Sequence, residues 1–207
     1  MRPDPQAVLT FWLETVGPPG WWTPDPALDA EVRRRFGLAW RMARLGAYAD
    51  WAETPEGAAA LLILLDQFPR NMFRGDTRSY ATDARARRVA LAALDRGHDL
   101  ATEGEARLFH YMPFEHAERL ADQDRAVRLF DARMPLARLY RLHARAHRAV
   151  IRKFGRFPFR NEALGRETTP EEAAWLESGG YAGEVESLAA RRGPSSEVAV
   201  HAGGATR

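Results

Sequence analysis

Apolar residues recur along most of the chain at steps of three and four, which is the spacing of one face of an α-helix. In the stretch 27–45 these positions are Leu28, Val32, Phe36, Ala39, Trp40 and Ala43. The same kind of pattern predicts further helices at 5–16, 82–96, 103–112, 124–130 and 136–154. No segment alternates between apolar and polar residues as a half-buried strand would. The chain is therefore predicted to be all-α, with antiparallel helix pairs that form a bundle or a short solenoid.

The segment 58–68 is apolar on nearly every side rather than on one face. Thr54 and Pro55 precede it as an N-cap and a first helical residue. A strand is possible for such a run, but its length and alanine content favour a helix. We expect this helix to lie in the centre of the core, and we expect Pro69 to end or kink it at Phe68.

The last predicted helix begins at a capping box. Thr169-Pro170-Glu171-Glu172 combines a threonine N-cap, a proline and a carboxylate three residues on, and the helix should end near Ser178. The residues that follow are small, polar and rich in glycine, so they bury too little surface to offset the entropy of ordering. We expect one domain over 1–183 and a tail over 184–207, disordered from about residue 193.

Composition excludes several classes of function. The 207 residues include no cysteine, which excludes disulfides, zinc–thiolate sites, iron–sulfur clusters and thiol catalysis. Apolar runs stay well below ~18 residues and no signal peptide is visible, so we expect a soluble cytoplasmic protein without a membrane span. The formal net charge is only +2. Arginines alternate with acids along the predicted helix faces, and we expect no nucleic-acid partner. No phosphate loop, dinucleotide fingerprint or nucleophile elbow occurs, and we expect no cofactor.

The first polar cluster directly follows the buried apolar run. It consists of Asp66, Gln67, Arg70 and Asn71. Polar groups at a buried helix end need partners. Arg70 could pair with Asp66 while the amides satisfy helix-end carbonyls, or the four side chains could line a pocket. The spacing slightly favours the first interpretation.

The second cluster places His116 between two acidic residues, Glu115 and Glu118, with Gln123 nearby. Such a histidine could be a general base whose pKa the acid raises. It could also be a metal ligand or a hydrogen-bonded histidine at a helix kink. The residue types alone leave these three possibilities open.

The third cluster repeats the first. Phe-Pro-Arg-Asn stands at 68–71, and Phe-Pro-Phe-Arg-Asn stands at 157–161. Arg156, Arg160 and Asn161 could meet the first cluster at one site, where arginines away from acids would favour a carboxylate or phosphate ligand. Alternatively, each arginine caps helix-end carbonyls.

His143 and His147 lie four residues apart and so share a helical face. The spacing permits metal binding, but the zinc-protease motif is absent. We expect His147 to bond a neighbour in the polar cluster, and we expect no metal site.

Taken together, these motifs resemble the bacterial DUF924 family over roughly residues 5–180. The resemblance rests on Leu-Asp-Gln-Phe-Pro-Arg-Asn at 65–71, Pro-Phe-Glu-His-Ala-Glu at 113–118, Phe-Gly-Arg-Phe-Pro-Phe-Arg-Asn at 154–161, and the shorter matches at 164–166 and 169–172. It implies an all-helical, tetratricopeptide-like right-handed stack with no established activity. The positions that match the family's polar motifs are Asp66, Gln67, Arg70, Asn71, His116, Glu118, Gln123, His147, Arg156, Arg160 and Asn161.

Two positions depart from that family pattern. Phe159 stands where the family usually has histidine, and Ala117 stands where it often has serine. If that histidine were a catalytic base, this chain would lack it.

Two functional hypotheses follow. In the first, the clusters form a pocket for a small anionic molecule, in a binding protein or an enzyme: His116 acts as general acid or base, Asp66 or Glu118 orients it, and the other matched residues bind the ligand. In the second, the chain is a tetratricopeptide-like module for a peptide or protein, with exposed aromatics such as Trp21, Trp22 or Trp51. We favour the first, because helix capping rarely needs so many unlike polar groups together.

Overall fold

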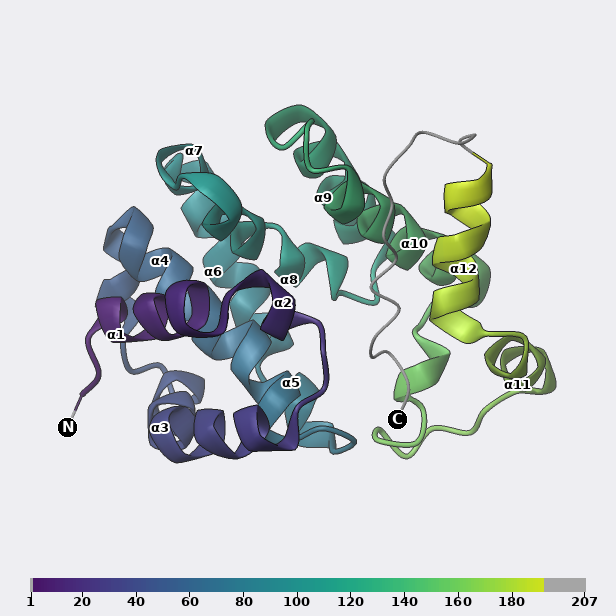
Figure 1. Ribbon diagram of the computed structural model, residues 1–207, viewed down its shortest axis with the longest axis horizontal. Coiled ribbons are helices and arrows are strands. Elements are labelled where there is room, and N and C mark those ends of the chain that lie inside the picture. Colours follow the sequence, from purple (N-terminus) through teal and green to yellow (C-terminus); the bar gives the residue numbers. More distant parts are fainter. Residues whose placement is uncertain (1, 192–207) are drawn as a thin grey trace. The chain divides into compact units, whose positions relative to one another are not determined.

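The computed structural model describes residues 2–191, and within that range the chain forms helices and loops without a β-strand (Figure 1). The all-helical prediction is therefore confirmed for the described residues. Internal contacts divide the chain into two compact units, Met1–Pro113 and Phe114–Arg207. The single domain over 1–183 stays a prediction, and the disorder expected from about residue 193 lies outside the described residues.

The first unit consists of one long helix, α3, surrounded by short α, π and 3-10 segments. In chain order these are α1 (Pro5–Leu9), the π-helix η1 (Thr10–Val16), α2 (Gly17–Trp21), α3 (Pro26–Arg44), the 3-10 helix η2 (Ala49–Glu53), α4 (Pro55–Leu62), the π-helix η3 (Ile63–Gln67), α5 (Phe68–Met72), the 3-10 helix η4 (Thr77–Tyr80), α6 (Asp83–Asp95), α7 (His98–Ala101) and the 3-10 helix η5 (Gly104–His110).

The second unit contains two long helices that follow one another, and then shorter ones. The elements are α9 (Leu120–Arg133), α10 (Arg138–Phe154), the 3-10 helix η6 (Pro158–Arg160), α11 (Pro170–Glu177) and α12 (Gly180–Ala190), while the single turn α8 (Met112–Glu115) contains the division between the units.

The helix α12 covers residues that the sequence analysis left outside any helix. Its sequence has no strong apolar periodicity, so the 3.6-residue pattern gave no signal for it. Gly179 has φ 107°, a left-handed conformation that lets the chain leave α11 and start α12 at once. The capping box that starts α11 is present as predicted, with Glu172 N–H donating to Thr169 Oγ1 at 3.2 Å.

The central apolar helix begins as predicted but does not end where expected. Thr54 caps α4, and its Oγ1 accepts from Gly57 N–H at 3.1 Å. At Pro69 the chain does not leave the helical path. The chain widens into the π-helix η3 just before Phe68 and then continues through Pro69 as α5. Phe68 has right-handed helical backbone angles.

A donor from outside the helix compensates for Pro69. Because proline has no N–H, the Leu65 carbonyl four residues earlier loses its usual donor. Thr82 Oγ1 donates to this carbonyl at 2.5 Å and in turn accepts from Trp40 Nε1 at 3.1 Å. The buried carbonyl is thus satisfied, and the helix passes through the proline.

Phe68 lies at the centre of an aromatic cluster in the first unit. It is fully buried. Its ring centroid lies 4.7 Å from that of Phe36, 5.4 Å from that of Trp12 and 6.1 Å from that of Phe11. These contacts fasten α5 to α3 and to the N-terminal helices.

Tyr48 is the only non-glycine residue among the described residues with positive φ, at 66°. The left-handed conformation costs an L-residue about 1–2 kcal/mol. Its ring stacks on that of Trp51, with centroids 4.9 Å apart and an interplanar angle of 22°. The turn therefore holds these two rings together in spite of its backbone cost.

The core of the second unit forms where α10 meets α12 and the loop that follows α10. Its buried members are Val150, Ile151, Phe157 and Trp175, with Phe154, Phe159 and Tyr181 packed against them. Gly155, with φ 70°, ends α10 at the left-handed position typical of a helix C-terminus. The loop thus returns Phe157 to the face of the helix it has just left.

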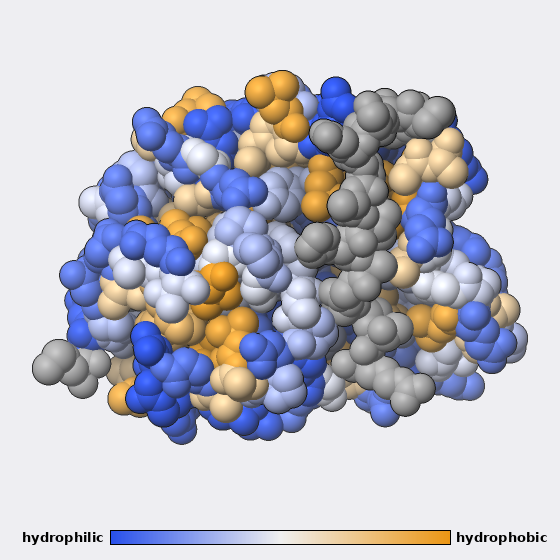
Figure 2. All heavy atoms as spheres, viewed as in Figure 1, coloured by the Kyte–Doolittle hydropathy of each residue, from blue (hydrophilic) through white to orange (hydrophobic). Residues whose placement is uncertain are grey.

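The apolar core residues are buried, and eight large apolar side chains of the described residues are exposed. Figure 2 shows hydrophobic residues as separate orange groups among hydrophilic ones. Within the described part of the chain, no helix combines the length and the apolar character needed to cross a bilayer.

We expect Phe68→Ala to lower the free energy of unfolding by about 3–5 kcal/mol, because it removes a buried ring and leaves a cavity. Urea unfolding followed by circular dichroism measures this loss. Leu38→Ala on α3 is the control: Leu38 is 60% exposed, so the change should stay within about 0.5 kcal/mol. Equal losses for the two variants would contradict the aromatic core described above.

Candidate functional site

The first polar cluster lies in the first unit, where Arg70 is held by acids. Its Nη1 and Nη2 donate to the two carboxylate oxygens of Asp83 at 3.0 and 2.9 Å, and Nη1 also donates to the Asp66 carbonyl at 2.5 Å. Burial acts to lower the pKa of Arg70, but Asp83 and Asp66 outweigh it and raise that pKa. Arg70 Nη1 also lies 3.4 Å from Asp66 Oδ1, so the structure contains the pairing of Arg70 with Asp66 that the first interpretation named.

The amides of this cluster also have acidic partners. Gln67 Nε2 donates to Asp66 Oδ2 at 2.5 Å. Asn71 Nδ2 donates to Asp29 Oδ1 at 2.9 Å, and Arg74 also binds that carboxylate. The cluster thus ties α5 to α3.

The second and third clusters meet within the second unit through Glu118. Its Oε1 accepts from Phe157 N–H at 2.8 Å, and Arg166 donates to Oε2 and Oε1 at 2.7 and 3.0 Å. Burial acts to raise the pKa of Glu118, but the bonds from Arg166 and from the Phe157 amide lower it overall. Glu118 was proposed to orient His116; its two oxygens are engaged here with Phe157 and Arg166.

Gln123 fixes the backbone of the second cluster. Its side chain is fully buried on α9. Nε2 lies 2.5 Å from the Glu115 carbonyl, 2.7 Å from that of Ala117 and 3.5 Å from that of Phe114. Because α8 is a single turn, this amide replaces the hydrogen bonds that a longer helix would supply.

In the third cluster, Arg156 and Asn161 share one acid, Glu172. Arg156 Nε and Nη2 donate to its two oxygens at 2.6 and 2.7 Å, and Asn161 Nδ2 donates to Oε2 at 3.1 Å. The bond from Arg156 is the main cause that lowers the pKa of Glu172 to about 2. These residues join the loop to the start of α11.

The group of side chains best suited to acid–base catalysis is a carboxylate–histidine pair. Glu115 Oε1 lies 2.8 Å from His147 Nδ1, and the Glu115 side chain is only 6% exposed. His147 comes from α10, and Glu115 comes from the last residue of α8. A buried carboxylate bonded to one imidazole nitrogen orients the ring and sets which nitrogen carries the proton.

Two further side chains extend this pair into what we call the histidine network: Glu115, His147, Tyr181 and His143. The Tyr181 hydroxyl lies 2.9 Å from His147 Nδ1 and 2.8 Å from His143 Nδ1. His147 Nδ1 also lies 3.0 Å from the His143 carbonyl. The network therefore links α8, α10 and α12.

One arrangement of protons pairs Glu115 with His147 and Tyr181 with His143, and the single hydrogen on His147 Nδ1 cannot serve equally all three oxygens that lie near it. His147 Nδ1 faces two acceptors, the Glu115 carboxylate and the His143 carbonyl, so it carries a hydrogen. The Tyr181 hydroxyl then donates to His143 Nδ1, which accepts with its lone pair. His147 Nε2 is left with a lone pair, and among the described residues none of the hydrogen bonds of His147 uses Nε2.

Burial and neighbouring charges shift the pKa values of three members of the network. Burial acts to raise the pKa of Glu115, but His147 outweighs it and the pKa lies below its usual value. Burial lowers the pKa of His143, so that ring is neutral. Burial also raises the pKa of Tyr181 well above its ordinary value, so the phenol keeps its proton.

Other sequence candidates surround His147. The His116 ring lies 6.0 Å from the His147 ring at an interplanar angle of 68°. Phe157 packs edge-on to His147 at 5.5 Å, and the Arg160 guanidinium lies over Phe157 at 4.4 Å. Phe159 contacts Tyr181 at 6.1 Å, so the departure from the family pattern lies beside the network.

Sequence reasoning found part of this site. It singled out His147 and quoted Glu115 only as a flank of His116. The pair at 143 and 147 was considered for metal binding, but no three histidine or acidic side chains of the described residues are arranged to hold a metal ion. Tyr181 was missed because it lies on α12, whose apolar positions follow no clear helical period.

We expect Glu172→Gln to lower the free energy of unfolding by about 1–3 kcal/mol at pH 6, because Arg156 and Asn161 lose their charged acceptor. The pKa of Glu172 is lowered from 4.5 to about 2 in the folded chain, so its contribution is complete above pH 4.5 and is lost as pH falls toward 2. Urea midpoints of both proteins should therefore converge at low pH. Glu171→Gln, at an exposed neighbouring acid, is the control, and a pH-independent difference for Glu172→Gln would contradict the pairing.

Comparisons with known proteins identify a family and a solved structure with a similar fold. None of the curated proteins matches the chain. A solved structure of ATU0120 from Agrobacterium tumefaciens, a protein of unknown function, is 46% identical, with a TM-score of 0.80 over 84% of this chain and 97% of that chain. Residues 8–180 match the family described as "Bacterial protein of unknown function (DUF924)". The chain therefore belongs to the DUF924 family.

Proposed function

We propose that the histidine network is a general acid–base site that acts on a small molecule, with His147 Nε2 as the atom that takes and returns the proton. The observation that carries this proposal is the 2.8 Å contact between Glu115 Oε1 and His147 Nδ1. The contact supports a tautomer in which Nε2 is the basic nitrogen. General acid–base groups of this kind contribute about 10²–10⁴-fold to a rate.

Glu115 would stabilise the charge that forms during turnover. When Nε2 accepts a proton, the ring becomes an imidazolium, and the neighbouring carboxylate stabilises it. The lowered pKa of Glu115 keeps that carboxylate ionised. Tyr181, which stays neutral, would contact the same Nδ1 as Glu115 and help to fix the orientation of the ring.

His116 keeps a role in this proposal as the second imidazole. Its ring contacts that of His147, and it is among the groups that lower the pKa of Glu115. We propose that His116 supplies or receives the proton on the other side of the substrate, as the acid–base hypothesis from the sequence expects.

The anionic half of that hypothesis remains a proposal that involves three arginines. Arg70 and Arg156 are each bound by a carboxylate, to Asp83 and Glu172. Arg160 lies over Phe157, which itself contacts His147, and it is among the groups that lower the pKa of Glu118.

The tetratricopeptide-like right-handed stack also remains a proposal. It is supported by the packing of helices adjacent in the chain, α9 with α10 and α11 with α12. A peptide-binding role is less well supported, because Trp21 and Trp51 are 8% and 4% exposed and offer little surface to a partner. We accordingly favour the acid–base site.

We expect neutral His147 to carry its proton on Nδ1 and neutral His143 to carry its proton on Nε2. Two-bond ¹H–¹⁵N spectra distinguish a protonated ring nitrogen from an unprotonated one. Tyr181→Phe should redistribute the His143 proton, since its Nδ1 loses a donor, and should leave the His147 tautomer unchanged. A His147 ring protonated on Nε2 in its neutral form would contradict the proposed base.

We expect the protein to accelerate the hydrolysis of p-nitrophenyl acetate, an activated ester that any accessible imidazole base can attack or assist. His147→Gln and Glu115→Gln should each lower the rate at least about 100-fold. Glu118→Gln is the matched control, because that acid lies three residues from Glu115 but binds Arg166. It should reduce stability and retain the rate. Full activity of His147→Gln would rule out the proposed function.

A further inference from the structure

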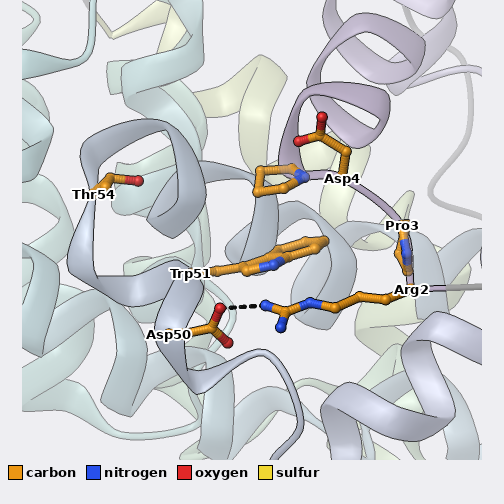
Figure 3. Close-up of a pocket in the computed structure, with 7 residues that line it drawn as sticks. Arg2, Pro3, Asp4, Asp50, Trp51 and Thr54 are labelled. Atoms are coloured by element: carbon orange, nitrogen blue, oxygen red, sulfur yellow. Dashed lines mark hydrogen bonds and ion pairs between the residues drawn. The ribbon is translucent and has the colours of Figure 1, made fainter.

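Outside the histidine network, the first unit contains an open pocket of about 410 Å³ beside the turn that carries Tyr48. Arg2, Asp4, Asp50, Trp51 and Thr54 contribute to its lining. Figure 3 shows the Arg2 side chain extended alongside the Trp51 indole, with its guanidinium toward Asp50. The pocket is thus formed between the segment ahead of α1 and the 3-10 helix η2.

The Arg2 guanidinium makes the contacts that a bound cation would make. It forms an ion pair with Asp50. Its central carbon lies 5.2 Å from the centre of the Tyr48 ring and 6.0 Å from that of the Trp51 ring. Aromatic faces and a carboxylate together recognise guanidinium groups, by stacking and by charge-assisted hydrogen bonds.

The turn holds these groups in place without help from Arg2. Tyr48 and Trp51 stack on each other, and Trp51 N–H donates to the Tyr48 carbonyl at 3.0 Å. Gly57 allows α4 to approach this turn, because a Cβ added there would lie 2.2 Å from the Trp51 carbonyl oxygen. The two rings are therefore preorganised by local packing.

The charge of the lining also favours a cation. Apart from Arg2, the described residues of the lining include two carboxylates, Asp4 and Asp50, and no other basic side chain. Asp4 caps α1 by accepting from Gln6 N–H at 3.0 Å, so its position is fixed. Removing the Arg2 side chain would leave two carboxylates in this lining.

We propose that Tyr48, Asp50 and Trp51 form a binding site for a guanidinium group, which the chain's own Arg2 occupies. Only Pro3 separates Arg2 from the helix cap at Asp4, so Arg2 is tethered close to its site. A tethered group competes at an effective concentration on the order of millimolar. An outside ligand must displace it, and the intact protein therefore binds such a ligand weakly.

The test is a calorimetric titration of full-length Arg2→Ala with methylguanidinium chloride. We expect it to bind at least about 10-fold more tightly than the wild type, because the competing group is gone and the site is always free. Added sodium chloride should weaken the binding. The Trp51 indole N–H signal should shift during the titration. Adding Asp50→Asn to this variant should abolish the gain.

The chain supplies a matched control in Arg78. Its guanidinium pairs with Asp76 at 2.8 Å and lies 4.6 Å from the Phe73 ring centre, so it offers an acid and a single ring. Arg78→Ala should gain no affinity for methylguanidinium. If Arg2→Ala binds no better than the wild type or than Arg78→Ala, or if Asp50→Asn leaves the gain intact, the proposal is overturned.

Discussion

A polar atom taken out of water must find a hydrogen-bonding partner, and this requirement explains the long-range contacts of both units. The helices are short and interrupted, so many backbone groups lie at helix ends. In the first unit Thr82 donates to the Leu65 carbonyl that Pro69 leaves without a donor. In the second unit Glu118 accepts from the Phe157 amide, and Gln123 binds the carbonyls around Glu115. The polar motifs are thus structural partners first, and the candidate chemistry arises where one such contact involves an imidazole.

The pattern of the sequence predicts the long helices well, because their apolar faces are regular. The predicted helix at 27–45 corresponds to α3, and the capping box at Thr169 starts α11. The continuation through Pro69 could not be predicted, because its donor, Thr82, is seventeen residues away in the chain. The helix α12 was missed for a different reason, since its apolar positions follow no clear period.

The candidate site was only partly predictable. A histidine next to two acids indicates a candidate functional region, but the sequence does not determine which acid contacts which histidine. Backbone direction decides this: Glu115 reaches His147, while Glu118 reaches Arg166. The echo between 68–71 and 157–161 suggested a shared site, yet Arg70 and Arg156 each bind an acid of their own surroundings. Similar motifs can therefore occupy different local structures and bind different partners.

The bond between Gln123 and the Glu115 carbonyl has a dynamic consequence. The acid of the pair is attached to α9 through Gln123, whereas the base is part of α10. These two helices pack against each other along the second unit (Figure 1). The distance between the Glu115 carboxylate and the His147 ring therefore changes when α9 and α10 move relative to each other. A slow opening of that pair would break the contact without any change in the residues themselves, and closing would restore it.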